Sequence, residues 1–158
     1  MTTFTRLYRF AASHRLHSPA LSDAENHSLY GKCNNPYGHG HDYVLEVTAV
    51  GPIDPISGRL LPLASLDRLV EEKVLQLFRN RNINLDVAEF AELVPTTENV
   101  ALVIARLLQQ HWAAYLPGSS ARLARVHIQE TARNGFEVLL AVTSERLSSQ
   151  KELENVHA

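Results

Sequence analysis

The sequence predicts an α+β fold in which a four-stranded antiparallel sheet carries two helices on one face. Three observations support this prediction: strand-like segments near both ends of the chain, helical periodicity in its middle, and a hairpin signal at Asn134-Gly135. The expected order is therefore strand, strand, helix, helix, strand, strand. At 158 residues and 45% hydrophobic composition, the chain fits one domain with a real core, which we place at residues 1–144.

The four expected strands form two pairs. Phe4 to Ser13 alternates weakly, whereas Asp42 to Val50 (DYVLEVTAV) alternates and is rich in β-branched residues. The second pair, Arg122 to Thr131 and Phe136 to Thr143, flanks the hairpin signal. Arg15 to Gly38 is polar and rich in Ser, Asn, Gly and Pro, which predicts a long loop, and loops of that length in a compact domain are usually functional.

Two amphipathic segments predict the helices. The first follows Ser65, a plausible N-cap, and its apolar stripe consists of Leu66, Leu69, Val70, Val74, Leu77 and Phe78. The second begins near Thr96 or Thr97 and stops at Pro117-Gly118. Its expected buried face consists of Val100, Val103, Ile104, Leu107 and Leu108. Residues 145–158 form a polar tail. The open edges of a four-stranded sheet favour pairing between subunits.

Composition excludes several classes of function. The net charge of −2 provides no basic surplus for nucleic-acid binding. The sequence shows no apolar run that suggests a signal peptide or a membrane span. The single cysteine, Cys33, rules out an internal disulfide and suits a reducing cytoplasm. We therefore expect a small soluble cytoplasmic protein.

The clearest functional signal is a group of histidines. His39 and His41 lie two residues apart at the start of the second strand, so their side chains share one face. His14 ends the first strand, the expected hairpin partner, although His17 in the same SHRLH segment is a competitor. Three histidines with an open fourth position are typical of a catalytic Zn²⁺ site, and they would also accept nickel or copper. His27, His111 and His127 are expected to be surface or interface histidines.

Five segments resemble the 6-pyruvoyltetrahydropterin synthase family: FAASHRLHSPALSD, LYGKCNNPYGHGHDYVLEV, NINLDV, PTTENVA and VHIQET. They occur in the family's order from about Phe4 to Thr143. The resemblance implies the tunnelling fold (T-fold), with trimers that stack into a homohexamer and active sites at subunit interfaces. It also implies a zinc-dependent lyase that converts 7,8-dihydroneopterin triphosphate to 6-pyruvoyltetrahydropterin with elimination of triphosphate.

The resemblance assigns roles to particular residues. His14, His39 and His41 correspond to the zinc ligands, Cys33 to the catalytic base and Glu130 to the carboxylate that anchors the pterin ring. The segment Thr96, Thr97 and Glu98 corresponds to residues that line the same pocket. Without the resemblance, Glu130 reads as an ordinary solvated carboxylate, Thr97-Glu98 as a helix start and Cys33 as a buried filler. Five residues separate Cys33 from His39, which favours the biopterin-pathway type over 6-carboxytetrahydropterin synthases.

One departure from the family pattern stands out. Where the family carries an Asp-His pair that relays protons, alignment on NINLDV places Arg79 and Asn80, and neither is a base at neutral pH. Arg79 is hypothesised either to lower the pKa of Cys33 or to bind a phosphate. The alternatives are a pterin side-chain-cleaving enzyme of the 6-carboxytetrahydropterin synthase type, or a pterin-binding homologue with little or no turnover.

Overall fold

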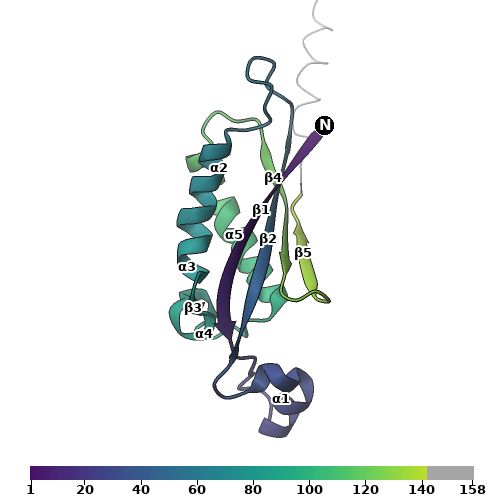
Figure 1. Ribbon diagram of the computed structural model, residues 1–158, viewed down its shortest axis with the longest axis vertical. Helices are drawn as coiled ribbons and strands as arrows, with labels where there is room; N and C mark the ends of the chain where they lie inside the picture. Colours follow the sequence, from purple (N-terminus) through teal and green to yellow (C-terminus); the bar gives the residue numbers. More distant parts are fainter. Residues whose placement is uncertain (142–158) are drawn as a thin grey trace, which may run out of the picture.

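The computed structural model describes residues 1–141, and its main feature is one twisted sheet. Strand β1 (Thr2–His14) pairs antiparallel with β2 (His39–Gly51) along its whole length. Strand β4 (Arg122–Gln129) pairs antiparallel with β2 and with β5 (Gly135–Leu139). The two expected strand pairs are therefore present, and their meeting at β2 and β4 makes them one sheet (Figure 1).

The sheet has five strands, so the expected number of four is wrong. The additional strand, β3 (Arg81–Asn82), runs parallel to β1 opposite Ala12 and Ser13 and gives the order β3-β1-β2-β4-β5. Two residues are too few to show alternation, so periodicity could not reveal this strand. Strand β3 begins directly after Arg79 and Asn80, so its pairing with β1 places these two residues beside the sheet.

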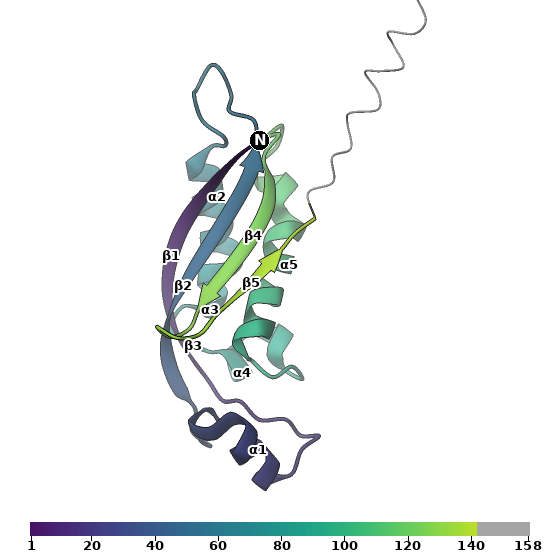
Figure 2. The same cartoon turned by 90° about the vertical axis from the view of Figure 1, so that its right-hand side faces the viewer.

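The principal helices lie on one face of the sheet, as expected (Figures 1 and 2). One helical segment comprises α2 (Leu63–Val70), a π-helical turn (Glu71–Leu75) and α3 (Gln76–Phe78). The long helix α5 (Thr97–Tyr115) packs against β4 and β5. Large, fully buried side chains between helices and sheet include Tyr43, Phe78, Leu45, Leu66, Leu69, Ile83, Ile104, Leu108 and Ile128. Burial of such side chains provides the main driving force for this packing.

The first helical segment departs from the expected stripe after its π-helical turn. Leu77 is 37% exposed, whereas Leu75 is buried in the core. A π turn holds more residues than an α turn, so the buried face shifts at this turn and Leu75 takes the place expected for Leu77, while Phe78 stays buried as expected. The start also differs: the N-cap position is Pro62 with no side-chain cap, and Ser65 lies within α2. The expected buried face of α5 is confirmed in full.

The expected loop between β1 and β2 is partly helical. It contains α1 (Asp23–Tyr30), which continues into a 3-10 turn (Gly31–Asn34). Ser22 and Glu25 form a capping box, so the S-x-x-E spacing in the sequence was the signal for this helix. Figure 1 shows α1 beyond the end of β1 and the start of β2. His14 and His39 lie at these two strand ends.

Two short turns, α4 (Ile83–Asp86) and a 3-10 turn (Ala88–Phe90), connect β3 to α5. Within residues 1–141, no helix has both the length and the apolar character needed to span a membrane. The predicted tail, 145–158, and the end of the fourth predicted strand lie outside the described residues.

Candidate metal centre

The three predicted histidines meet where β1 ends and β2 begins. His14 and His39 are register partners across the β1–β2 pair, and His41 follows His39 by two residues. Because alternate strand residues share a face, all three imidazoles project to the same side of the sheet. Their ring centroids lie 5.1 Å (His14–His39), 4.9 Å (His14–His41) and 4.5 Å (His39–His41) apart. The strand pairing thus gathers three nitrogen donors at one point.

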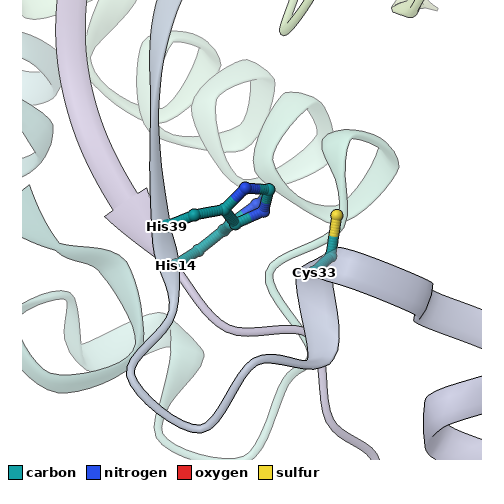
Figure 3. A group of neighbouring side chains, drawn as sticks. All are labelled: His14, Cys33 and His39. Atoms are coloured by element: carbon teal, nitrogen blue, oxygen red, sulfur yellow. The ribbon is translucent and has the colours of Figure 1, made fainter.

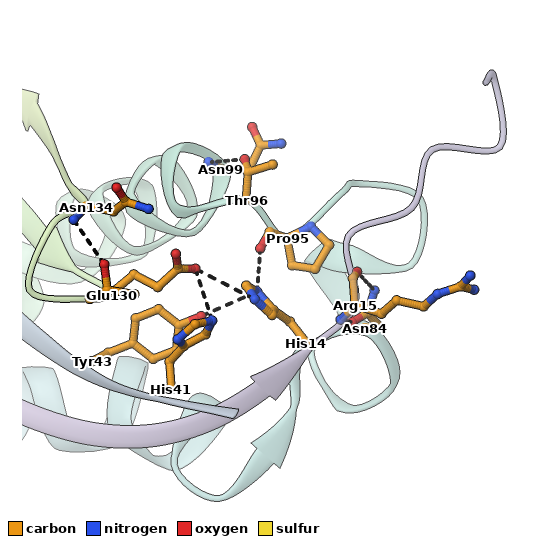
Figure 4. A network of polar contacts seen from close by, with 11 residues as sticks. His14, Arg15, His41, Tyr43, Asn84, Pro95, Thr96, Asn99, Glu130 and Asn134 are labelled. Carbon is orange, nitrogen blue, oxygen red and sulfur yellow. Dashed lines mark hydrogen bonds and ion pairs between the residues drawn. The ribbon is translucent and has the colours of Figure 1, made fainter. Parts of the chain in front are cut away.

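Each imidazole presents one nitrogen that has no hydrogen-bond partner in the described part of the protein. Within residues 1–141, Nε2 of His14, of His39 and of His41 is buried and lacks a hydrogen bond. His14 Nδ1 lies 2.9 Å from the carbonyl oxygen of Pro95 (Figure 4). Since a carbonyl oxygen can only accept, Nδ1–H donates and the lone pair is left on Nε2. A second contact of this kind orients metal-binding histidines.

Burial keeps His14 neutral. It lowers the pKa of this fully buried side chain to about 4, and the neighbouring His41 and His39 lower it further while the Pro95 contact opposes the shift. Burial also lowers the pKa of His39, with a smaller effect of His41 in the same direction. Neutral imidazoles are the form that binds a metal. Buried nitrogens with lone pairs and no donor nearby are costly unless a cation or water satisfies them.

Cys33 and Glu130 add sulfur and oxygen donors beside the histidines. Donor atoms of His14, Cys33 and His39 lie within 4.8 Å of one another, and so do those of His14, His41 and Glu130. Figure 3 shows that the imidazole rings of His14 and His39 point toward the side on which the Cys33 sulfur lies. Glu130 Oε1 lies 3.7 Å from Nε2 of both His14 and His41. A donor set of three imidazoles with a thiol or carboxylate fits zinc.

Comparisons with known proteins identify the family of this chain. The family described as 6-pyruvoyl tetrahydropterin synthase matches residues 3–140. The chain belongs to this family. It is 46% identical over 130 residues to the 6-pyruvoyl tetrahydrobiopterin synthase of Poecilia reticulata, covering 82% of this chain and 84% of the relative. It is 50% identical over 106 residues to that of Homo sapiens, covering 67% and 73%.

A solved structure supports the same assignment. The 6-pyruvoyl tetrahydropterin synthase of Caenorhabditis elegans superposes with a TM-score of 0.79 at 41% identity, covering 89% of this chain and 96% of that one. The Plasmodium vivax structure, at 14% identity and a TM-score of 0.59, shows the shared fold alone. Family membership confirms the expected T-fold and an enzyme of the 6-pyruvoyl tetrahydropterin synthase-like lyase class.

Arg79 does not act on Cys33 within one chain of this synthase-family protein. Its guanidinium makes two 2.9 Å contacts with the carboxylate of Glu71, in the π-helical turn. The pKa of the Cys33 thiol is raised, first by burial and then by the negative charge of Glu130. The hypothesis that Arg79 lowers this pKa is therefore wrong for the isolated chain. Asn80 has a left-handed backbone (φ 57°), and its N–H donates to Ala11.

The other predicted pocket residues divide into two groups. Thr96 caps α5 by accepting a hydrogen bond from the Asn99 N–H, while Thr97 and Glu98 form the first turn, where Glu98 is exposed. In this segment the group that touches His14 is the Pro95 carbonyl. Glu130, directly after β4, lies among the histidines with a side chain only 8% exposed, so it is not an ordinary solvated carboxylate.

Sequence reasoning missed Tyr43. This residue is 1% exposed, and its hydroxyl lies 3.4 Å from His14 Nδ1. Burial, followed by the charge of Glu130, raises its pKa well above the usual range, so its hydroxyl stays protonated. The signal was present in the alternation, because residues 39, 41 and 43 of β2 share one face.

The other histidines of residues 1–141 lie outside the cluster. His17, the competitor of His14, has its Nδ1 3.2 Å from the side-chain nitrogen of Asn34. His27 is exposed on α1, and His111 lies within α5. His127 lies on β4 with its Nδ1 3.6 Å from Glu46.

Proposed function

We propose that this protein is a zinc-dependent lyase that converts 7,8-dihydroneopterin triphosphate to 6-pyruvoyltetrahydropterin with elimination of triphosphate. The observation that carries the proposal is the set of three buried Nε2 atoms without a hydrogen bond in the described residues, with the Cys33 sulfur beside those of His14 and His39. The names of the relatives, 6-pyruvoyl tetrahydrobiopterin synthases at 46% and 50% identity, support the same reaction. The zinc ion and the triphosphate-eliminating reaction are the two parts of this proposal, and the sequence led us to expect both.

His14, His39 and His41 would hold the ion. Zinc bound there would act as a Lewis acid toward the oxygens of the substrate side chain, and its charge would favour the Cys33 thiolate. The Pro95 carbonyl accepts a hydrogen bond from Nδ1–H of His14, so the proton stays on Nδ1 and the lone pair of Nε2 faces the metal position. Cys33 would remove the proton of the side-chain carbon next to the phosphate-bearing carbon as triphosphate leaves, and the resulting enol would become a ketone by moving its hydroxyl proton to the terminal carbon. The other hydroxyl-bearing carbon would become a ketone as its two hydrogens pass to the C6=N5 bond of the dihydropterin ring. Glu130 would accept hydrogen bonds from the 2-amino group and ring N–H of the pterin.

The assembly belongs to the same proposal. Within residues 1–141, the outer edge of β5 has no strand partner, and β3 covers only Ala12 and Ser13, so the rest of β1 is also an edge. Leu7 on β1 and Leu139 on β5 are 56% and 72% exposed. Exposed apolar residues on open edges favour pairing with another copy, as in a homohexamer of two stacked trimers. The single free thiol suits the cytoplasm.

A second candidate follows from Arg79. Its pairing with Glu71 provides no proton relay, because a guanidinium stays protonated at neutral pH. The same centre could then cleave the pterin side chain, as 6-carboxytetrahydropterin synthases do, or bind a pterin with little or no turnover.

Mass spectrometry of the pterin product distinguishes these functions. Zinc-loaded protein is incubated with 7,8-dihydroneopterin triphosphate, and Cys33→Ala with verified zinc content serves as the matched control. A 6-pyruvoyl product that disappears in the variant supports the lyase. Release of a small carbon fragment supports side-chain cleavage. Unchanged substrate with intact binding rejects both enzymatic functions in favour of a binding protein.

A further inference from the structure

A cavity next to the metal centre is lined by two cationic side chains, Arg15 and Lys32, which have no role in the proposed chemistry. It has a volume of about 920 Å³, and its lining includes Arg15, Lys32, His27, Asp23 and His39. This volume falls within the range of small-molecule sites. Since His39 also belongs to the histidine cluster, the cavity and the metal centre adjoin.

We propose that Arg15 and Lys32 bind the triphosphate of the substrate in this cavity. Each residue directly adjoins a residue of the centre in the chain: Arg15 follows His14, and Lys32 precedes Cys33. Figure 4 shows the Arg15 side chain extending away from the His14 ring. This inference rests on the proposed function, which supplies a substrate with three phosphates.

The two cationic residues are held on neighbouring segments by cross-connecting hydrogen bonds. The Leu16 N–H donates to the Cys33 carbonyl (2.8 Å), and the Asn34 amide donates to the Leu16 carbonyl (2.8 Å). Arg15 Nε donates to the Asn34 carbonyl (3.2 Å). The Asn84 side chain contacts both the N–H (2.8 Å) and the carbonyl (2.9 Å) of Arg15. The backbone under Arg15 is therefore fixed before any ligand binds, which lowers the ordering cost of binding.

The positive charges of Arg15 and Lys32 are available to bind phosphate. Within residues 1–141, neither Arg15 nor Lys32 forms an ion pair with a carboxylate. Arg15 uses only Nε in its contact with Asn34, so its two terminal nitrogens remain as a fork for phosphate oxygens. Asp23 is the carboxylate of this lining, and its negative charge opposes an anion. Arg79, the earlier candidate, already has its guanidinium bound to Glu71.

The test compares two ligands that differ only in phosphate. Binding of 7,8-dihydroneopterin triphosphate and of 7,8-dihydroneopterin is measured by calorimetry in the zinc-loaded Cys33→Ala background, which prevents turnover. We expect the triphosphate form to bind at least about 100-fold more tightly, and Arg15→Gln or Lys32→Gln to reduce that preference by about tenfold each. Asp23→Asn should increase it. Arg106→Gln, which removes an exposed arginine on α5, is the matched control and should leave it unchanged.

The outcomes separate this inference from the proposed function. If the protein binds the phosphate-free pterin but shows no preference for the triphosphate, or if the Arg15→Gln/Lys32→Gln double variant keeps the preference, the inference is overturned and the function stands. If neither pterin binds, the function is overturned, and binding of inorganic triphosphate to the metal-free chain decides the anion site. Lys32→Gln keeps the test decisive if Arg15→Gln misfolds, because the Lys32 side chain makes no hydrogen bond within the described residues.

Discussion

His14 Nδ1 lies 2.9 Å from the Pro95 carbonyl oxygen, and this contact joins the end of β1 to the segment that precedes α5. It links residues 81 positions apart in the sequence. Because the carbonyl accepts a hydrogen bond from Nδ1–H, the lone pair lies on Nε2, which points to His39 and His41. One hydrogen bond therefore sets both the tautomer and the orientation of the most buried imidazole of the centre.

Metal binding should depend on His14 and not on His17. His14→Asn, His39→Asn or His41→Asn is expected to lower zinc affinity by roughly 100-fold or more, since each removes a donor, whereas second-sphere changes cost about 10–100-fold. His17→Gln is the matched control because its ring contacts Asn34 instead of the cluster. Competition with a chromophoric chelator measures the affinities. Loss of zinc in His17→Gln with retention in His14→Asn would reverse the assignment.

The stability of the metal-free protein should fall in acid through His14. Its pKa is lowered from 6.5 to about 4 on folding, so the unfolded chain binds the proton more readily. The resulting stability is fully present above about pH 6.5 and is lost as the pH falls toward 4, by about 3 kcal/mol in total. Urea unfolding at several pH values measures this slope. His14→Gln should flatten it, whereas the exposed His27→Gln should not; equal slopes in wild type and His14→Gln would refute the prediction.

Asn80 should tolerate glycine better than a branched residue. Its φ of 57° lies in the left-handed region, where asparagine is accepted and a β-branched side chain is strained. We expect Asn80→Val to lower the free energy of unfolding by about 1–2 kcal/mol and Asn80→Gly to leave it nearly unchanged. Denaturant unfolding provides the measurement. A Gly variant as unstable as the Val variant would show that the side chain, not the backbone, matters there.

Exchange of the Arg79–Glu71 pair should change turnover more than stability. Both side chains are more than 40% exposed, so solvent screens their attraction and Arg79→Ala should barely shift the melting temperature. The triple variant Glu71→Gln/Arg79→Asp/Asn80→His restores the family's Asp-His pair and removes the carboxylate that would repel it. If the missing relay limits the reaction, product formation should rise about tenfold or more. A rate equal to wild type would show that the protein relays protons by another route.

Local sequence determined the strand faces and most of the centre. Alternation placed His39 and His41 together, and the hairpin pairing of β1 with β2 brought His14 opposite His39. These predictions depended only on backbone periodicity between neighbouring elements. By contrast, the S-x-x-E capping box of α1 was local and visible, yet the polar composition of the segment concealed it.

Tertiary structure decided what periodicity cannot encode. The Pro95 contact with His14, the approach of Glu130 to His41 and the pairing of Arg79 with Glu71 join residues whose separation in the chain carries no regular pattern. The π-helical turn likewise exchanged Leu77 for Leu75 in the core. Packing free energy, summed over the whole sheet and its helices, selects these contacts. The sequence by itself therefore determined which side chains could form the centre, and the fold decided their partners.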